Sequence, residues 1–412
     1  MAAWNTESLG SIAEMASDKI SVSKLTAESY ISTENMLPDR GGVQLAVKLP
    51  PSGSVNAFFP GDVLFSNIRT YFKKVWLAPW QGGASADVIV FRSKDGRKLD
   101  SQYLYYVLSS DNFIESTVTA SKGTKMPRGD KEAMRRFEFP LPPLPIQRRI
   151  AGILSAYDEL IENSQRRIKI LESMARALYR EWFVHFRFPG HESVPRVPSP
   201  LGEIPKGWEV STLGAHLAAL ESGKRPKGGI RDVENGVPSI GAENINGIGQ
   251  HDFAGEKFIP RDFFQEMRKG IVRDRDVAIY KDGAYIGKSS YFRDGFPHVE
   301  CCVNEHVFLL RASGVRLKQN ALYLWLQEPD TVQTIRSKNA NAAQPGINQQ
   351  TVGGLTLTLP DSQMAAQFDQ LVDPIFAEVI NLAKKVQNLR RTRDLLLPRL
   401  LSGQIDVEAI PT

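Results

Sequence analysis

Two polar loops occupy equivalent places in the two halves of the sequence, and their side chains are suited to binding a polyanion. The first loop, residues 121–136 (SKGTKMPRGDKEAMRR), is basic, and the second, residues 337–350 (SKNANAAQPGINQQ), is rich in amides. Lysine and arginine bind phosphates, whereas asparagine and glutamine can read adenine through paired hydrogen bonds in the major groove. The loops therefore predict contacts with double-stranded DNA, while any single residue in them can equally be explained as part of a solvated loop.

Shorter loops earlier in each half add lysine, arginine and tyrosine side chains to this prediction. The complete set of candidate DNA-binding residues is Arg69, Tyr71, Lys73, Lys74, Lys122, Lys125, Arg128, Lys281, Tyr285, Lys288, Lys338, Asn341, Gln344, Asn348 and Gln349. No short motif fixes which of these side chains touches a base, so the set rests on the chemistry of the loops.

The sequence lacks the motifs that catalysis on DNA would need, and we expect no catalytic residue in this chain. An adenine methyltransferase needs an Asn/Asp-Pro-Pro-aromatic stretch and a glycine-rich loop for its methyl donor, and neither pattern occurs. Gly247-Ile248-Gly249 lacks the strand–turn–helix context of a cofactor loop and indicates a turn. Walker loops and a nuclease-like set of carboxylates and lysine are also missing from the sequence.

The run from His298 to His306 superficially resembles a metal site, because it contains histidine, glutamate and two adjacent cysteines. Zinc ligands usually come as spaced pairs whose side chains converge. Neighbouring cysteines on a strand, such as Cys301 and Cys302, point to opposite faces. We therefore expect a strand in this run, and neither a metal nor a cofactor bound by this chain.

The bulk composition is that of a soluble globular protein. The chain has 412 residues, of which 42% are hydrophobic and 24% charged, and this length suits two to four domains. Its net charge of +5 permits a polyanionic partner without requiring one. The two adjacent cysteines form no disulfide framework, and the sequence shows no secretory signal or membrane span. These features predict a cytoplasmic protein.

Two long helices are expected to position the loops, because the sequence contains two heptad seams with alternating steps of four and three. The first seam consists of Ile150, Leu154, Tyr157, Ile161, Ser164, Ile168, Leu171, Ala175, Leu178 and Trp182. The second follows 218 residues later (368 − 150) and consists of Phe368, Val372, Ile375, Val379, Leu382, Val386, Leu389, Arg393, Leu396 and Leu400. Matching seams in one chain predict an intramolecular antiparallel coiled coil, and two helices in separate cores are the weaker alternative.

The regions around the seams share short anchors that indicate a tandem duplication. Trp4-x4-Leu-Gly returns at Trp208, and Leu141-Pro142 returns at Leu359-Pro360. We predict a target-binding domain over residues 1–140, a helix over 141–188, a proline-rich linker over 189–207, a second domain over 208–358, and a helix with a C-terminal tail over 359–412. The mixture of strand and helix patterns predicts an α/β (α+β) fold for both domains.

Several stretches of this sequence resemble the specificity subunits of type I restriction–modification enzymes. They are PLPPLPIQRRIAGIL, LYREWFVHFRFPG, LGEIPKGWEVSTLG, GDVLF, and LTLP followed by LLLPRLLSGQIDV. The resemblance implies two target-recognition domains that each read one half of a split, asymmetric DNA site. It also implies an antiparallel helical spacer that docks two methyltransferase subunits. S-adenosylmethionine, ATP and Mg would then be bound by the methyltransferase and by the restriction (translocase and nuclease) subunits.

A second interpretation of the same features is a coiled-coil scaffold whose duplicated domains bind proteins. Under that interpretation, binding to DNA would be weak and independent of sequence. DNA-binding assays at two salt concentrations, with the partner methyltransferase present, distinguish the two interpretations.

Overall fold

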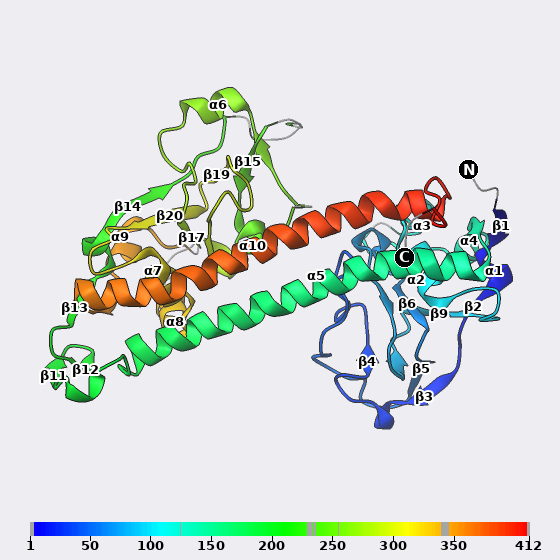
Figure 1. Cartoon of the computed structure of the whole chain (residues 1–412), viewed down its shortest axis with the longest axis horizontal. Helices are drawn as coiled ribbons and strands as arrows, with labels where there is room; N and C mark the ends of the chain where they lie inside the picture. The colour runs from blue at the N-terminus through cyan, green and yellow to red at the C-terminus, as the bar shows by residue number, and fades with distance from the viewer. Residues whose placement is uncertain are drawn as a thin grey trace. The chain divides into compact units, whose positions relative to one another are not determined.

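A computed structural model of the chain describes residues 4–409 except 124, 228, 230–232, 234–235, 254 and 339–345 (Figure 1). The chain divides into two compact units. Unit 1 contains Met1–Leu160 and Leu389–Thr412, and unit 2 contains Ile161–Asn388. Each unit therefore includes one segment of each long helix. Within the described ranges, no helix combines the length and the apolar character needed to cross a membrane.

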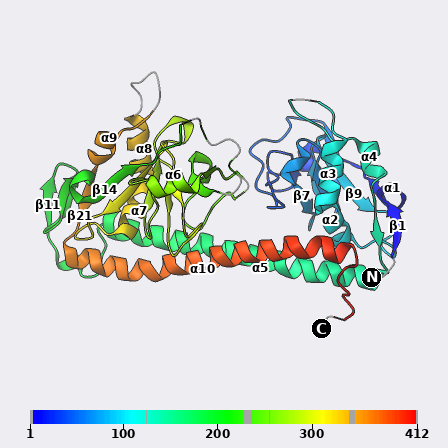
Figure 2. The ribbon, with the colours of Figure 1, turned by 90° about the horizontal axis from the view of Figure 1, so that it is seen from above.

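Unit 1 combines two four-stranded sheets with four short helices. Its strands are β1 (Asn5–Ser8), β2 (Ala13–Met15), β3 (Lys19–Ser21), β4 (Tyr30–Ile31), β5 (Ser54–Phe58), β6 (Val63–Ser66), β7 (Val75–Leu77), β8 (Gly82–Ala84), β9 (Val88–Ser93) and β10 (Glu138–Leu141). Its short helices are α1 (Leu9–Ile12), α2 (Ser101–Ser109), α3 (Asp111–Thr119) and α4 (Lys131–Arg135). The strand orders are β2-β9-β6-β7 and β3-β5-β8-β4, and β1 pairs with β10. Helix α2 packs on the first sheet, as Figure 2 shows.

Unit 2 repeats this plan with a larger insertion. Its strands are β11 (Arg196–Ser199), β12 (Gly202–Pro205), β13 (Glu209–Thr212), β14 (Leu217–Ser222), β15 (Val237–Ile240), β16 (Phe258–Ile259), β17 (Val277–Tyr280), β18 (Ser289–Tyr291), β19 (Cys302–Val303), β20 (Val307–Ala312) and β21 (Thr356–Leu359). Its short helices are α6 (Arg261–Glu266), α7 (Gln319–Gln327), α8 (Pro329–Ser337) and α9 (Gln349–Gly353). The sheets have the orders β14-β20-β17-β18 and β16-β15-β19, and β13 pairs with β21.

The order and the bounds of the elements confirm the tandem repeat. Helices α2 and α7 begin at residues 101 and 319, α4 and α9 at 131 and 349, and the long helices α5 (Leu144–Tyr179) and α10 (Ser362–Leu401) at 144 and 362. Each pair is thus offset by the same 218 residues (319 − 101, 349 − 131, 362 − 144). Because the offset is constant over these six helices, any difference in length between the two halves lies upstream of α2 and α7.

Both heptad seams face protein, as the periodicity predicted. None of the seam residues is exposed, and Ile150, Leu154, Phe368 and Val372 have no accessible surface. In unit 2, the ring of Trp182 lies 5.5 Å from that of Phe368. In unit 1, the beginning of α5 packs against the end of α10 around Leu400. Within each unit, therefore, the two helix segments pack antiparallel.

In unit 1, an ionic contact joins the two long helices, α5 and α10. Arg393, on α10, donates a hydrogen bond of 2.6 Å to Asp158 on α5. The second oxygen of the same carboxylate accepts a 2.7 Å hydrogen bond from the hydroxyl of Tyr106 on α2. The Arg393 side chain is only 8% exposed. Arg393, which interrupts the apolar seam, thus connects α10 to α5, and Asp158 extends this connection to α2.

In unit 2, α10 contributes an anion, Asp373, to an ionic contact. Asp373, on α10, accepts from Arg293 at 2.9 Å, from Arg275 at 2.7 Å and from the amide of Asn320 at 3.1 Å. Burial alone would raise the pKa of Asp373, but the hydrogen bonds from Arg293 and Asn320 outweigh burial and lower it. Here the helix supplies the anion, and the globular part supplies the cations.

One expectation on a single element holds only in part. The run 298–306, expected to be a strand, is a strand only over Cys302–Val303. The proline-rich stretch 189–207 contains the hairpin of β11 and β12, whose edges tolerate prolines. Helices α2 and α3 meet at Ser110, which ends the first and caps the second. Helix α10 continues through Pro374 and Pro398.

Candidate nucleic-acid interface

In unit 1, the loop after β6 lies against the loop before α4. Ile68 and Arg128 form an isolated antiparallel bridge, and the backbone N–H of Arg69 donates to the carbonyl of Pro127 at 2.9 Å. The Arg69 guanidinium donates to the backbone carbonyl of Lys125 at 3.3 Å. We call residues 67–72 and 122–129 the unit 1 loop pair. Segments that are more than 50 residues apart in the sequence thus form one basic surface.

The cations of this loop pair keep their charged ends in solvent. Lys122 pairs with Asp130 at 2.8 Å, yet its side chain is 82% exposed. Arg128 pairs with Asp87 at 2.9 Å and is 60% exposed. The hydrogen bond from Lys122, helped by two backbone N–H groups, lowers the pKa of Asp130 to about 2. Since exposed pairs of this kind contribute little energy, a phosphate can replace either carboxylate at small cost.

Exposed apolar side chains accompany these cations. Tyr71 and Phe72 are adjacent aromatic residues with ring centroids 4.7 Å apart, and both are exposed. Met126, at the turn between Lys125 and Arg128, is 53% exposed. Phe72 and Met126 are absent from the predicted set, because that set contains cations, amides and tyrosines. Their exposure beside cations is the signal that singles them out, and it is visible only in the structure.

Two predicted residues of unit 1 are engaged elsewhere. Lys73 forms a 2.7 Å ion pair with Asp111 at the start of α3. Lys74 donates to the backbone carbonyl of Thr33 at 2.6 Å, and burial lowers the pKa of its ammonium group. The structure therefore brings together Arg69, Tyr71, Lys122, Lys125 and Arg128, and it directs the two lysines toward partners inside unit 1.

Unit 2 forms its loop contact at the equivalent position. Asp282 and Gly346 form an isolated antiparallel bridge, and the N–H of Ile347 donates to the carbonyl of Lys281 at 2.9 Å. Gly346 corresponds to Arg128 at the repeat offset (346 − 128 = 218). We call residues 281–288 and 346–350 the unit 2 loop pair. The same joining of two distant loops therefore occurs in both halves of the chain.

The first loop of this pair presents a cation and an aromatic ring together. The ammonium of Lys288 lies 4.4 Å from the ring centroid of Tyr285, whose side chain is 54% exposed. Lys281 instead lies over the ring of Phe308, at 4.7 Å, and is half-buried. Tyr285 and Lys288 are thus the accessible candidates of this loop.

The amides of the second loop have partners within unit 2. Asn348 caps α9, because its side-chain oxygen accepts from the N–H of Thr351 at 2.8 Å. Asp130 caps α4 at the same repeat position (348 − 130 = 218). Gln349 donates to the carbonyl of Leu220 at 2.9 Å. An Asn or Asp directly before a short helix is a capping signal in the sequence, so this role was accessible to sequence reasoning.

The other amide candidates cannot be placed. Asn341 and Gln344 lie outside the described residues. Lys338 is exposed and follows the last residue of α8.

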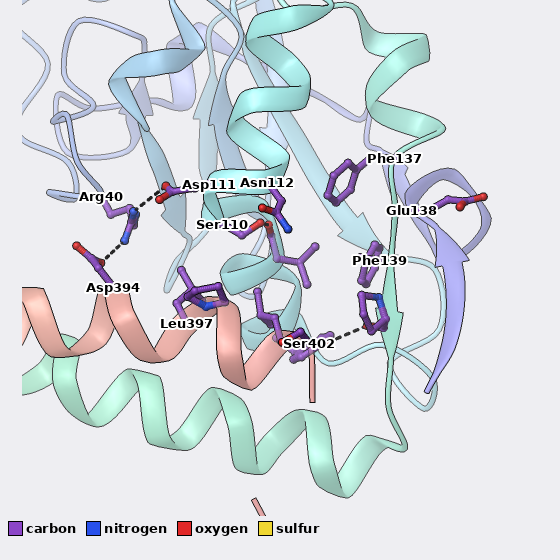
Figure 3. Close-up of a pocket in the computed structure, with 15 residues that line it drawn as sticks. Arg40, Ser110, Asp111, Asn112, Phe137, Glu138, Phe139, Asp394, Leu397 and Ser402 are labelled. Atoms are coloured by element: carbon purple, nitrogen blue, oxygen red, sulfur yellow. Dashed lines mark hydrogen bonds and ion pairs between the residues drawn. The ribbon is translucent and has the colours of Figure 1, made fainter. Parts of the chain in front are cut away.

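A cavity of about 150 Å³ lies in unit 1 beside the end of α10 (Figure 3). Figure 3 shows the Arg40 guanidinium between Asp394 and Asp111, to which it is bound at 2.7 and 3.8 Å. The rest of the lining contains the apolar or aromatic residues Tyr103, Val107, Phe137, Phe139, Leu397 and Leu401, and the polar residues Ser110, Asn112, Glu138 and Ser402. This cavity holds no loop residue of the predicted set, so it belongs to the attachment of α10 and not to the loop surface.

Comparison with known proteins agrees with this architecture. Residues 1–173 match the family of type I restriction modification DNA specificity domains. Two relatives from Methanocaldococcus jannaschii are the type I restriction enzyme MjaIX specificity subunit, 26% identical over 77% of this chain and 71% of the relative, and the MjaVIII specificity subunit, 24% identical over 79% and 75%. The crystal structure of a type I restriction–modification S subunit from M. genitalium has the same fold, with a TM-score of 0.58 and 17% identity over 97% of this chain and 96% of that one.

The fold and the loop pairs define a duplicated protein in which two α/β units share two long antiparallel helices. The chain is similar to the specificity subunits of type I restriction–modification systems, and its residues 1–173 match a type I restriction modification DNA specificity domain.

Proposed function

We propose that this chain selects the DNA sequence on which a type I restriction–modification complex acts. In this proposal, unit 1 and unit 2 each read one half of a bipartite, asymmetric site. The observation that carries the proposal is the repeated loop pair, formed by Ile68 with Arg128 and by Asp282 with Gly346. Two similar surfaces with different side chains are suited to two half-sites of different sequence.

The chain's role in the complex is to direct chemistry that its partners perform. Two methyltransferase subunits dock on the long helices and supply S-adenosylmethionine, and restriction subunits supply the ATP- and Mg-dependent steps. The complex works in the cytoplasm. This division of labour is supported by the sequence, in which we find no methyl-donor loop and no acceptor motif.

Exchange of one domain tests the proposal. Residues 1–140 are replaced by the equivalent segment of a relative with a different target, and methylated adenines are mapped in cells that also express the methyltransferase. We expect one half of the methylated motif to change and the other half to persist. A motif that changes in both halves, or in neither, contradicts the proposal, and a protein-binding scaffold would leave the motif unaltered.

We also propose that the long helices set the number of base pairs between the half-sites. A heptad inserted at facing positions of α5 and α10 lengthens the pair by about 10 Å, which is about three base pairs of DNA. The motif map of this variant should show the same half-sites with a longer gap. An active variant that keeps the original gap contradicts the role of the helices as a spacer.

A further inference from the structure

Two histidines and a glutamate that belong to neither loop pair converge in unit 2. The Nε2 atom of His251 lies 2.5 Å from Oε1 of Glu256, and Nε2 of His298 contacts the same oxygen. One ligand-type atom from each residue lies within 4.8 Å of the other two. In the part of the chain that the structure describes, no other group of three histidine, cysteine or carboxylate side chains meets this condition.

The cluster is enclosed on most sides and open on one. The side chains of His251 and Glu256 are 1% and 9% exposed, whereas that of His298 is 24% exposed. The ring of Phe253 packs against both imidazoles, with centroids 4.6 and 5.7 Å away. A solvated small ion can therefore reach the cluster beside His298 and lose part of its water shell within it.

From this geometry we infer that His251, Glu256 and His298 form a zinc-binding site. Two imidazole nitrogens and one carboxylate oxygen are a ligand set that zinc accepts, with a fourth position left for water. Tetrahedral ligands about 2 Å from zinc lie about 3.3 Å from one another. The present 2.5 Å between His251 and Glu256 needs to open by less than about 1 Å to reach that geometry.

A zinc ion at this place would tie two distant segments of unit 2. His298 is 42 residues from Glu256 in the sequence (298 − 256). On one side, the segment before His251 approaches α10, because a Cβ at Gly249 would lie 3.0 Å from Val379. On the other side, Glu300 pairs with Arg261 at the start of α6 at 3.0 Å. The ion would thus fix the connection between α10 and the small sheet β16-β15-β19, as a structural site.

Metal content of the purified full-length chain tests the inference. The chain is stripped with a chelator, incubated with Zn²⁺ and dialysed. We expect about one zinc per chain for the wild type, and a loss of affinity in His298→Ala and Glu256→Gln that exceeds the ~10–100-fold typical of outer-sphere partners. Zinc should also raise the melting temperature of the wild type but not of Glu256→Gln, whose amide can still accept hydrogen bonds from both histidines.

Matched controls separate this site from neighbouring groups. Glu300→Gln and the double variant C301S/C302S should keep the wild-type zinc content. Because the variants can fail to fold, Co²⁺ bound to the wild type gives an independent result. Its visible spectrum should show nitrogen and oxygen ligands without thiolate charge transfer. A wild type that retains no zinc, equal retention by Glu256→Gln, or a thiolate band overturns the inference and leaves a hydrogen-bonded cluster.

Discussion

The long helix α10 contributes a cation, Arg393, and an anion, Asp394, to its ionic contacts in unit 1, and an anion, Asp373, to its contact in unit 2. In unit 1, Arg393 of α10 reaches Asp158 of α5 and, through it, Tyr106. In unit 2, Asp373 of α10 accepts from Arg293 and Arg275 of the globular part. Both attachments pair an arginine of the globular part with an aspartate of α10, Arg40 with Asp394 and Arg293 with Asp373, and unit 1 adds the contact of Arg393 with Asp158.

Repeat positions confirm that these contacts are not copies of each other. Arg393 corresponds to Ala175 (393 − 218) and Asp373 to Ser155 (373 − 218). Asp158 corresponds to Phe376, whose ring lies 5.4 Å from that of Tyr291. Duplication has therefore kept the backbone and the seam while each attachment acquired its own chemistry. A globular part placed on the wrong helix segment would face a buried charge with no partner, which is costly.

The largest expected effect is that of Arg393→Ala. The change leaves the Asp158 carboxylate partly buried and without its cation, while the hydroxyl of Tyr106 remains as a donor. We expect the free energy of unfolding of unit 1 to fall by about 3–5 kcal/mol. Chemical denaturation measures the change in free energy, and hydrogen exchange of the α2 backbone amides is the probe of unit 1.

The exposed Arg391 on the same helix is the matched control, and Arg391→Ala should have almost no effect. If both alanine variants unfold at the same denaturant concentration, the ionic attachment of unit 1 contributes nothing to its stability.

Asp373→Asn should have the next largest effect and should change the response to pH. The amide keeps a hydrogen bond but loses the charge that Arg293 and Arg275 need, at a cost of about 2 kcal/mol at neutral pH. Because folding lowers the pKa of Asp373, its contribution is present above the pKa of an unfolded aspartate and is lost as pH falls through the folded pKa.

Unfolding of unit 2, measured between pH 7 and pH 3, should therefore lose less stability in Asp373→Asn than in the wild type. Glu378→Gln, which removes an exposed ion pair with Arg167 on the same helix, is the control. Parallel curves for Asp373→Asn and the wild type would contradict an ionised carboxylate at this attachment.

A smaller effect should distinguish the basic loop pair of unit 1 from the amide-rich one of unit 2. The double variant R69A/K125A removes two exposed cations, and Lys73→Ala removes one that is already paired with Asp111. We expect R69A/K125A to weaken DNA binding on all sequences and to reduce the slope of log K against log salt by about 2. Titrations of the methyltransferase-bound chain at several salt concentrations measure the slope, and a reduction as large in Lys73→Ala would count against the loop pair.

The smallest effect concerns Asn348, which has the same capping position as Asp130. Asn348→Asp keeps an acceptor for the N–H of Thr351, so stability should change by less than about 0.5 kcal/mol. The aspartate has no amide donor, however, and a base contact through that donor would be lost. A changed methylation motif in this variant assigns Asn348 to base recognition, whereas an unchanged motif assigns it to capping alone.

The parts of the fold that the sequence predicted are those decided by local spacing. The steps of four and three placed all seam residues correctly, because a helix turns the same face inward regardless of what it meets. The anchor Trp208 and its repeat partner Trp4 likewise located the duplication. The strand expected over 298–306 is limited to Cys302–Val303, because only these two residues pair with a neighbouring strand, β15.

Contacts between distant residues could not be predicted in the same way. In the sequence, Arg393 is only a polar residue in an apolar seam, because its partner Asp158 lies 235 residues away. The sequence suggests ligands for His298 only among its neighbours up to His306, whereas its contacts are with the 251–256 segment. In the candidate interface, Lys73 and Lys74 were predicted from residue type alone, and their contacts with Asp111 and with the carbonyl of Thr33 are seen only in the structure. The predicted interface itself stays a prediction until the variants are measured.

The contact of Arg40 with Asp394 constrains which segment can replace residues 1–140. Such a replacement removes Arg40 and Tyr106 but keeps Asp158, Arg393 and Asp394. The new segment must therefore supply a basic group for Asp394 and a hydroxyl donor for Asp158. We expect the stability of a hybrid chain to depend on these two contacts, whatever the origin of the new segment.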